Sequence, residues 1–174
     1  MTELPYHREN LAAAIQQQAR KQLDQVGAEQ LSLRQIARFL AVTPAAVYRH
    51  FPDKASLLAA LYTEVVDELT ATLRANILDS ADATTMLRQM VTNLMTYAEH
   101  FPRAVAFYLT GTATATVPVS LTTVLTLYGA QRGMAVTPEM GRTVWTLLLG
   151  ILVQGPGAEL AVDWTVTQIE KLVH

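Results

Sequence analysis

The stretch from Leu31 to Leu58 reads LSLRQIARFLAVTPAAVYRHFPDKASLL, and it decides the fold of the N-terminal part of the chain. It contains two helix starts. Ser32 and Gln35 form a capping box, in which the serine oxygen accepts a hydrogen bond from the amide three residues on and the Gln35 side chain reaches back to the Ser32 amide. Thr43 and Pro44 start a second helix, because threonine is a good N-cap and proline fits the first helical position. The stretch therefore predicts two short helices joined by a tight turn.

The two short helices share one apolar face, and such spacing is typical of a helix-turn-helix unit. In that unit the second helix enters the major groove of DNA and presents its N-terminal residues to the base edges. Ala45 and Ala46 keep this helix slim where it goes deepest. The alternative is an ordinary three-helix bundle with solvated charges. The apolar residues are Leu33, Ile36, Ala37, Leu40, Val42, Val47 and Phe51.

The side chains expected to point away from this apolar face suit contact with DNA. Arg34 and Arg49 are the natural base readers, because a guanidinium fork matches guanine O6 and N7, and the paired alanines can pack on thymine methyl groups. Hydroxyl, imidazole and ammonium groups suit phosphates, together with the positive N-terminal ends of the two helices. The predicted DNA-contacting residues are Ser32, Arg34, Thr43, Pro44, Ala45, Ala46, Tyr48, Arg49, His50 and Lys54.

Charge is distributed unevenly along the chain. Residues 1–55 carry seven Lys or Arg against five Asp or Glu, whereas residues 56–174 carry six against ten. The net charge of −2 therefore hides a positive N-terminal part. Local potential, not the whole-chain charge, controls contact with phosphates.

Helical periodicity continues outside the helix-turn-helix. A helix is expected from Arg8 to Gly27, and another starts at Asp53 and is the only link between the two halves. Gly, Pro and Ser-Asp punctuation predicts further helices near 82–100, 103–110, 119–131, 138–154 and 159–173, with a loop at 110–119. We expect an all-α protein, with a three-helix DNA-binding domain at 1–53 and an antiparallel helical bundle at 54–174 that forms a dimer.

The N-terminal stretch resembles the TetR family of bacterial transcriptional regulators over residues 6 to about 62. The resemblance is carried by Leu31-Ser32-Leu33-Arg34-Gln35-Ile36-Ala37, by the segment from Val42 to Lys54, and by Leu57-Leu58. It implies an all-helical homodimer with an N-terminal DNA-binding domain and a C-terminal domain for dimerisation and ligand sensing. It also implies that Tyr48, His50 and Lys54 bind operator phosphates.

Two departures from the family pattern matter. The turn normally has glycine where this chain has Ala41, and a positive φ there would cost an alanine about 1 kcal/mol. The segment from Trp145 to Gly150 resembles the Trp-His-Gly signature of one C-terminal subfamily, but Leu149 replaces the histidine.

Catalytic and metal-binding motifs are missing from the sequence. The chain has no cysteine, no HExxH, no glycine-rich phosphate loop and no G-x-S-x-G, and its four histidines are scattered. Glu99 and His100 form a pair that lacks an orienting partner. We expect no enzyme activity, metal or cofactor. With no signal-peptide pattern and no apolar run long enough to span a bilayer, a cytoplasmic protein without membrane contact is expected.

The C-terminal half is rich in residues that suit a small-molecule pocket or a subunit interface. Methionine adapts to irregular shapes, and tyrosine brings a polar tip to an apolar wall. The candidate pocket residues, which could equally form a plain core, are Met86, Met90, Leu94, Tyr97, Phe107, Tyr108, Leu127, Tyr128 and Trp145. Helices that are apolar nearly all round need a second partner. The candidate dimer residues are Val144, Leu148, Ile151, Leu152, Trp164 and Ile169.

The sequence thus predicts a ligand-responsive transcriptional regulator, and it favours a repressor over an activator. It would bind a near-palindromic operator as a homodimer and be released by a small apolar or amphipathic effector. One alternative is a constitutive DNA-binding regulator whose C-terminal half only dimerises. Another is a helical enzyme or carrier with a relic helix-turn-helix, against which the absent catalytic groups argue.

Overall fold

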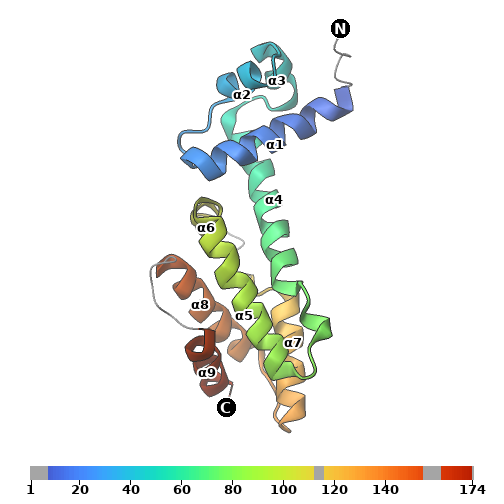
Figure 1. The fold of residues 1–174 in the computed structure, drawn as a ribbon, viewed down its shortest axis with the longest axis vertical. Coiled ribbons are helices and arrows are strands. Elements are labelled where there is room, and N and C mark those ends of the chain that lie inside the picture. The colour runs from blue at the N-terminus through green and yellow to red at the C-terminus, as the bar shows by residue number, and fades with distance from the viewer. Residues whose placement is uncertain (1–7, 112–115, 155–161, 174) are drawn as a thin grey trace. The chain divides into compact units, whose positions relative to one another are not determined.

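The computed structural model describes residues 8–111, 116–154 and 162–173, and within these ranges every regular element is a helix (Figure 1). The all-α prediction is confirmed. The elements are α1 (Arg8–Val26), α2 (Leu33–Phe39), α3 (Pro44–His50), α4 (Lys54–Arg74), the 3₁₀ helix η1 (Ile77–Asp79), α5 (Ala83–His100), α6 (Pro102–Leu109), α7 (Val119–Gln131), α8 (Pro138–Gln154) and α9 (Val162–Leu172).

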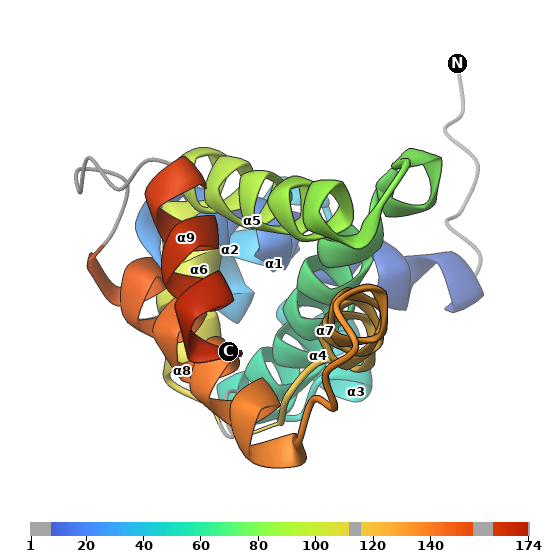
Figure 2. The same ribbon diagram turned by 90° about the horizontal axis from the view of Figure 1, so that it is seen from below.

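The chain divides into two compact units, Met1–Val65 and Val66–His174, and α4 continues from the first into the second. Unit 1 holds α1, α2, α3 and the first part of α4. In unit 2, α5 is the central helix, since it contacts η1, α6, α7 and α9, and α8 packs on α6, α7 and α9 (Figure 2). The functional domain boundary expected at residue 53 and the dimer stay predictions.

Unit 1 is built around a core to which each of its helices contributes. Ile15 of α1, Ile36 of α2, Val47 of α3 and Leu57 of α4 are fully buried. The predicted caps fix the starts of the two short helices: Ser32 Oγ accepts from the Gln35 amide at 3.4 Å, and Thr43 Oγ1 accepts from the Ala46 amide at 3.2 Å. Local hydrogen bonds therefore set where each helix begins, and the core sets how the helices pack.

The turn between α2 and α3 passes through Ala41, whose φ is 53°. The Val42 amide donates to the Ala37 carbonyl at 3.0 Å, which closes the end of α2 in the manner of a Schellman motif. A left-handed residue at this position is usually glycine, because a Cβ clashes there. The expectation that Ala41 sits at a strained position is confirmed.

We predict that Ala41→Gly stabilises the protein. Relief of left-handed strain is worth roughly 1–2 kcal/mol, and the extra freedom of glycine in the unfolded chain removes about half of that. Thermal unfolding should show a higher Tm. The matched control is Ala45→Gly, which places glycine at an exposed helical position and should lower stability by about 0.5–1 kcal/mol. A lower Tm for Ala41→Gly would contradict the strain argument.

Unit 2 follows the predicted helices closely, with three differences. The sixth helix begins at Pro102, one residue earlier than expected, because proline again occupies the first helical turn. The 3₁₀ helix η1 was not predicted; it follows Asn76, which is left-handed with φ 59°. The last helix begins at Val162, and residues 155–161 lie outside the described ranges, as do residues 112–115 of the expected loop.

Candidate nucleic-acid interface

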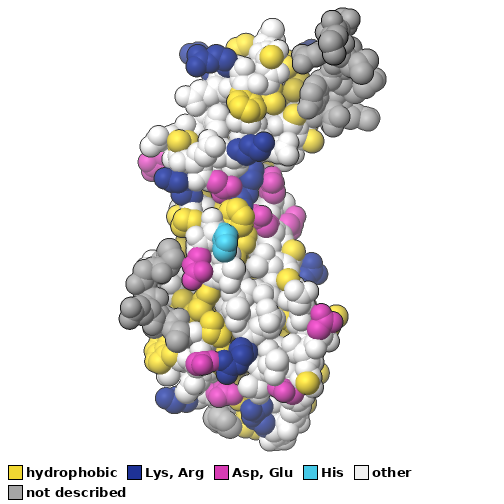
Figure 3. All heavy atoms as spheres, in the orientation of Figure 1, with side chains coloured by type: hydrophobic (Ala, Val, Ile, Leu, Met, Phe, Trp, Pro, Cys, Tyr) yellow, Lys and Arg dark blue, Asp and Glu magenta, His cyan; other side chains and the backbone are white. Residues whose placement is uncertain are grey.

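The α2–turn–α3 unit has the build of a helix-turn-helix, with α1 packed against both helices. On α3 the side chains of Ala45, Tyr48 and Arg49 are exposed, and Tyr48 retains 41% of its surface. His50 is half-buried. Figure 3 shows Lys and Arg side chains at the surface of unit 1, in the upper part of the view. The exposed face of α3 thus offers a methyl group, a phenol and a guanidinium to a partner.

One expectation for α3 is wrong. Ala46 does not point outward, since it is only 8% exposed and lies beside the fully buried Val47. A seven-residue helix has fewer than two full turns, so its apolar face takes in neighbouring positions. Ala45 is therefore the one of the two alanines whose methyl group can meet a partner, and Ala46 packs in the core.

The other candidate DNA-contacting residues lie at the surface of unit 1. Arg34 in α2, Thr43 and Pro44 are exposed, and Ser32 is half-buried. Lys54, expected to bind a phosphate, donates from Nζ to the backbone carbonyl of Glu29. This bond joins the start of α4 to the connection between α1 and α2. An ammonium group has three donors, so it can keep this bond and still bind an anion.

Asp53 caps α4 in the predicted way. Its carboxylate accepts from the Ser56 amide at 2.7 Å, and the Asp53 amide donates back to Ser56 Oγ at 3.3 Å. The backbone hydrogen bond from Ser56 lowers the pKa of the Asp53 carboxyl. The carboxylate is thus charged at neutral pH, and the cap fixes the residue where α4 begins.

Gln22 is a positioning residue that the sequence reasoning missed. Its side chain is 8% exposed, and Oε1 accepts from the Ser32 amide at 3.2 Å. The expectation that the Gln35 side chain accepts from this amide is therefore wrong, because Gln22 of α1 takes that place. A buried amide is costly without such a bond, so the bond fixes Ser32 against α1. The signal was present in the sequence, because Gln22 stands three residues after Ala19 and seven after Ile15, both fully buried, on the apolar face of the first helix.

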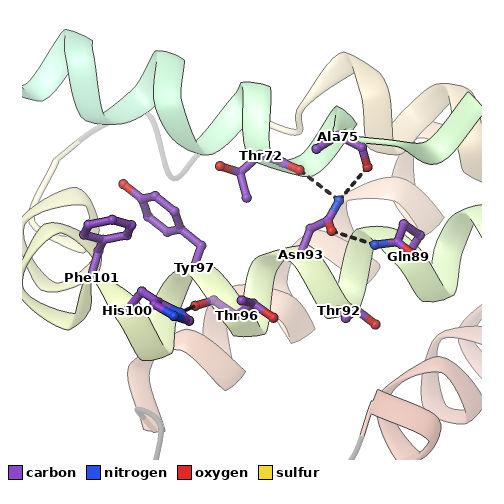
Figure 4. A pocket seen from close by; sticks show the side chains of 9 residues that line it. All are labelled: Thr72, Ala75, Gln89, Thr92, Asn93, Thr96, Tyr97, His100 and Phe101. Atoms are coloured by element: carbon purple, nitrogen blue, oxygen red, sulfur yellow. Dashed lines mark hydrogen bonds between the residues drawn. The ribbon is translucent and has the colours of Figure 1, made fainter.

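The effector-binding role of the nine residues named from the sequence stays a prediction, and the nine differ in how far they are buried. Met90, Leu94, Tyr97, Tyr108, Tyr128 and Trp145 are buried, Met86 and Phe107 are half-buried, and Leu127 is 45% exposed. Leu127 lies on the outer face of α7, so the expectation that it lines an internal pocket is wrong. Only Tyr97 among the nine lines the groove between α4 and α5 (Figure 4).

Tyr128 belongs to a polar network that ties three helices together. The Arg132 guanidinium stacks 3.7 Å from the centre of the Tyr128 ring, lies 3.8 Å from Glu170 of α9, and donates to Thr84 of α5 at 3.1 Å. Burial, followed by the charge of Glu170, raises the pKa of the Tyr128 phenol. These contacts give Tyr128 a structural role in unit 2.

Five of the six predicted dimer residues are buried within a single chain. Val144, Leu148, Ile151, Leu152 and Ile169 retain 0–8% of their surface, whereas Trp164 retains 45%. The apolar character of α8 is satisfied by α6, α7 and α9 of the same chain. The inference that these five residues need a second copy is therefore wrong, and the place of any subunit interface stays a prediction.

The fold and the exposed face of α3 define a helix-turn-helix protein. Residues 15–61 match the family described as bacterial regulatory proteins, tetR family. The matched N-terminal part of the chain is therefore a TetR-family DNA-binding domain, as the sequence motif implied. The subfamily suggested by the segment around Leu149 is not resolved. The family consists of regulators, which confirms the expectation that the chain is not an enzyme.

Known proteins resemble either the N-terminal part or the whole fold. The nucleoid occlusion factor SlmA of Escherichia coli O1:K1 is 30% identical over 76 residues, which are 44% of this chain and 38% of SlmA. The match thus spans less than half the length of that relative.

Two solved structures share the fold. BioQ with its natural double-stranded DNA operator has a TM-score of 0.63 and 24% identity, with 97% of this chain and 99% of that chain covered. A TetR variant from Acinetobacter baumannii AYE in complex with minocycline has a TM-score of 0.64 and 18% identity, covering 93% and 97%.

The described residues contain neither a membrane-spanning helix nor a metal-binding cluster. None of their helices is long and apolar enough to cross a membrane. Among the same residues, no three His, Asp or Glu side chains are grouped so that they could hold a metal ion.

Proposed function

We propose that this chain is a DNA-binding transcriptional regulator that acts in the cytoplasm as a homodimer on a near-palindromic operator, with repression as its mode. The observation that carries the proposal is the exposed face of α3, where Ala45, Tyr48 and Arg49 stand on a helix held by a buried core. The BioQ–operator complex supports it, because that protein shares the fold and is bound to DNA.

The exposed residues divide by chemistry into base readers and phosphate ligands. Arg34 and Arg49 are proposed to read guanine, since their guanidinium groups can make bidentate contacts, and Ala45 is proposed to pack on a thymine methyl. Tyr48, His50 and Lys54 are proposed to contact phosphates, which position the protein without specifying the sequence. The bond from Lys54 to Glu29 holds its ammonium group near the start of α4.

We predict that Arg49→Ala and Lys54→Ala weaken DNA binding in different ways. Arg49→Ala should relax base preference at one symmetric position of each half-site, at a cost of ~1–3 kcal/mol. Lys54→Ala should weaken all sequences nearly equally and lower the salt slope by about one for each protomer. Fluorescence anisotropy with operator variants at several salt concentrations measures both effects. Arg103→Ala, at an exposed position of α6 outside the proposed dimer interface, is the control. A changed preferred sequence in Lys54→Ala would refute this division.

The homodimer is proposed to use the outer faces of α8 and α9. These faces expose three large apolar side chains, which are Trp164 and Leu172 of α9 and Val153 of α8. The chain as a whole has 51% hydrophobic residues. The exposed residues Thr143, Thr146 and Gly150 continue the α8 face without charge. A two-fold axis across such a face would bury each exposed apolar side chain twice.

We predict that Trp164→Glu dissociates the dimer without unfolding the protomer, because Trp164 is 45% exposed in the single chain. Light scattering should show a monomer, and circular dichroism should show unchanged helicity. Leu78→Glu is the matched control, since Leu78 is 86% exposed on η1 and outside the proposed interface. A dimer that survives Trp164→Glu would place the interface elsewhere.

Release by a small molecule is the second part of the proposal. The TetR variant with minocycline shares the fold and holds a small ligand, which supports an effector for this chain. An effector can weaken operator binding only as far as its affinities for the two states differ, typically 5–150-fold. The alternative is a constitutive regulator, for which small molecules would leave operator affinity unchanged.

A further inference from the structure

Unit 2 contains a groove between the last turns of α4 and the outer face of α5 (Figure 4). Its volume is about 480 Å³, which lies within the range of small-molecule sites. The lining side chains carry no Lys, Arg, Asp or Glu, and they combine polar groups with two aromatic rings. They are Thr72, Ala75, Gln89, Thr92, Asn93, Thr96, Tyr97, His100 and Phe101.

At one end of the groove, Asn93 of α5 holds the end of α4. Its Nδ2 donates to the carbonyl oxygens of Thr72 and Ala75, at 3.0 and 2.8 Å. The last carbonyls of a helix lack partners within the helix, so this one amide satisfies two of them. Gln89 Nε2 donates to Asn93 Oδ1 at 2.8 Å and fixes the orientation of that amide.

At the other end, aromatic and imidazole groups line the groove. The Tyr97 hydroxyl donates to Glu68 of α4 at 2.8 Å, and the Tyr97 and Phe101 ring centres lie 5.1 Å apart. His100 Nδ1 lies 2.8 Å from the Thr96 carbonyl oxygen, which can only accept. Nδ1 therefore carries a hydrogen, and Nε2 is the ring nitrogen that remains for a hydrogen bond to a ligand.

We propose that this groove binds a neutral, planar aromatic compound that carries an amide or hydroxyl group. The rings of Tyr97 and Phe101 provide a surface for an aromatic ring. The imidazole of His100 and the threonine hydroxyls provide hydrogen-bonding groups. A charged compound would lose hydration without meeting an opposite charge in the lining, and the Glu68 carboxylate beside Tyr97 repels anions.

The same groove is placed to act on α4. Asn93 and Tyr97 are four residues apart on α5, and their bonds to Thr72, Ala75 and Glu68 hold the last turns of α4. A compound in the groove contacts the side chains that make these bonds and changes how strongly α4 is held. This step rests on the proposed function, because α4 continues into the DNA-binding unit.

The test uses the full chain, with labelled threonine methyl groups observed by NMR during titration with benzamide. Thr72, Thr92 and Thr96 report on the groove, and Thr143, Thr146 and Thr167 report on surfaces outside it. We expect saturable shifts at the groove threonines with a Kd on the order of 1 mM, as befits so small a compound. Benzoate, which has the same shape and a negative charge, and cyclohexanecarboxamide, which lacks the aromatic ring, should bind at least tenfold more weakly.

Two variants locate the binding. Thr96→Trp fills the groove and should abolish the benzamide-induced shifts. Thr123→Trp, at an exposed position of α7, should leave these shifts unchanged. His100→Ala removes an exposed side chain and should weaken benzamide several-fold with the fold intact. Equal binding by Thr96→Trp or His100→Ala and the parent chain, equal binding of benzoate, or shifts spread evenly over all threonines would overturn the proposal.

Operator affinity is measured separately, with and without saturating benzamide. A several-fold loss of affinity supports coupling through α4, and an unchanged affinity overturns that step. If the chain without benzamide binds no operator, the proposed function fails. The shifts of the groove threonines still test whether benzamide binds in the groove.

Discussion

The exposed face of α3, which is proposed to meet DNA, depends on one constraint: α2 and α3 are too short to be stable alone. Each has seven residues, and isolated helices of that length do not form in water. They persist because Ile36 and Val47 are fully buried, because both helices pack on each other and on α1, and because Ser32 and Thr43 cap their first turns. The direction in which Tyr48 and Arg49 point is therefore a consequence of the core.

Much of this arrangement could be predicted from the sequence, because its causes are local. A serine, threonine or aspartate that caps a helix acts on an amide three residues away, and the caps at Ser32, Thr43, Asp53 and Asp82 are present. The left-handed conformation of Ala41 could be anticipated for the same reason, because it depends on the local sequence of the turn. Ala46 was misplaced because a helix of two turns has too few positions for periodicity to separate neighbouring faces.

Features of unit 2 that depend on packing between distant segments could not be read from the sequence. The apolar surface of α8 is compatible with a second copy or with neighbours in the same chain, and the structure shows α6, α7 and α9 covering it. The hydrogen bonds from Asn93 to Thr72 and Ala75 of the α4 end join residues that are 21 and 18 positions apart in the sequence. No local sequence pattern predicts them. For these reasons five of the predicted dimer residues turned out to be buried within one chain, whereas the caps and the turn of the helix-turn-helix were predicted correctly.

Selection of bound duplexes from random-sequence DNA tests the central claim most directly. Two-fold related α3 helices must meet two half-sites whose centres are about 34 Å apart, or a multiple of that distance. We predict enrichment of a near-palindromic sequence with one half-site per protomer, and in Arg49→Ala a relaxed base preference at one symmetric position of each half-site. Enrichment of single asymmetric sites, or of no sequence at all at low salt, would contradict it.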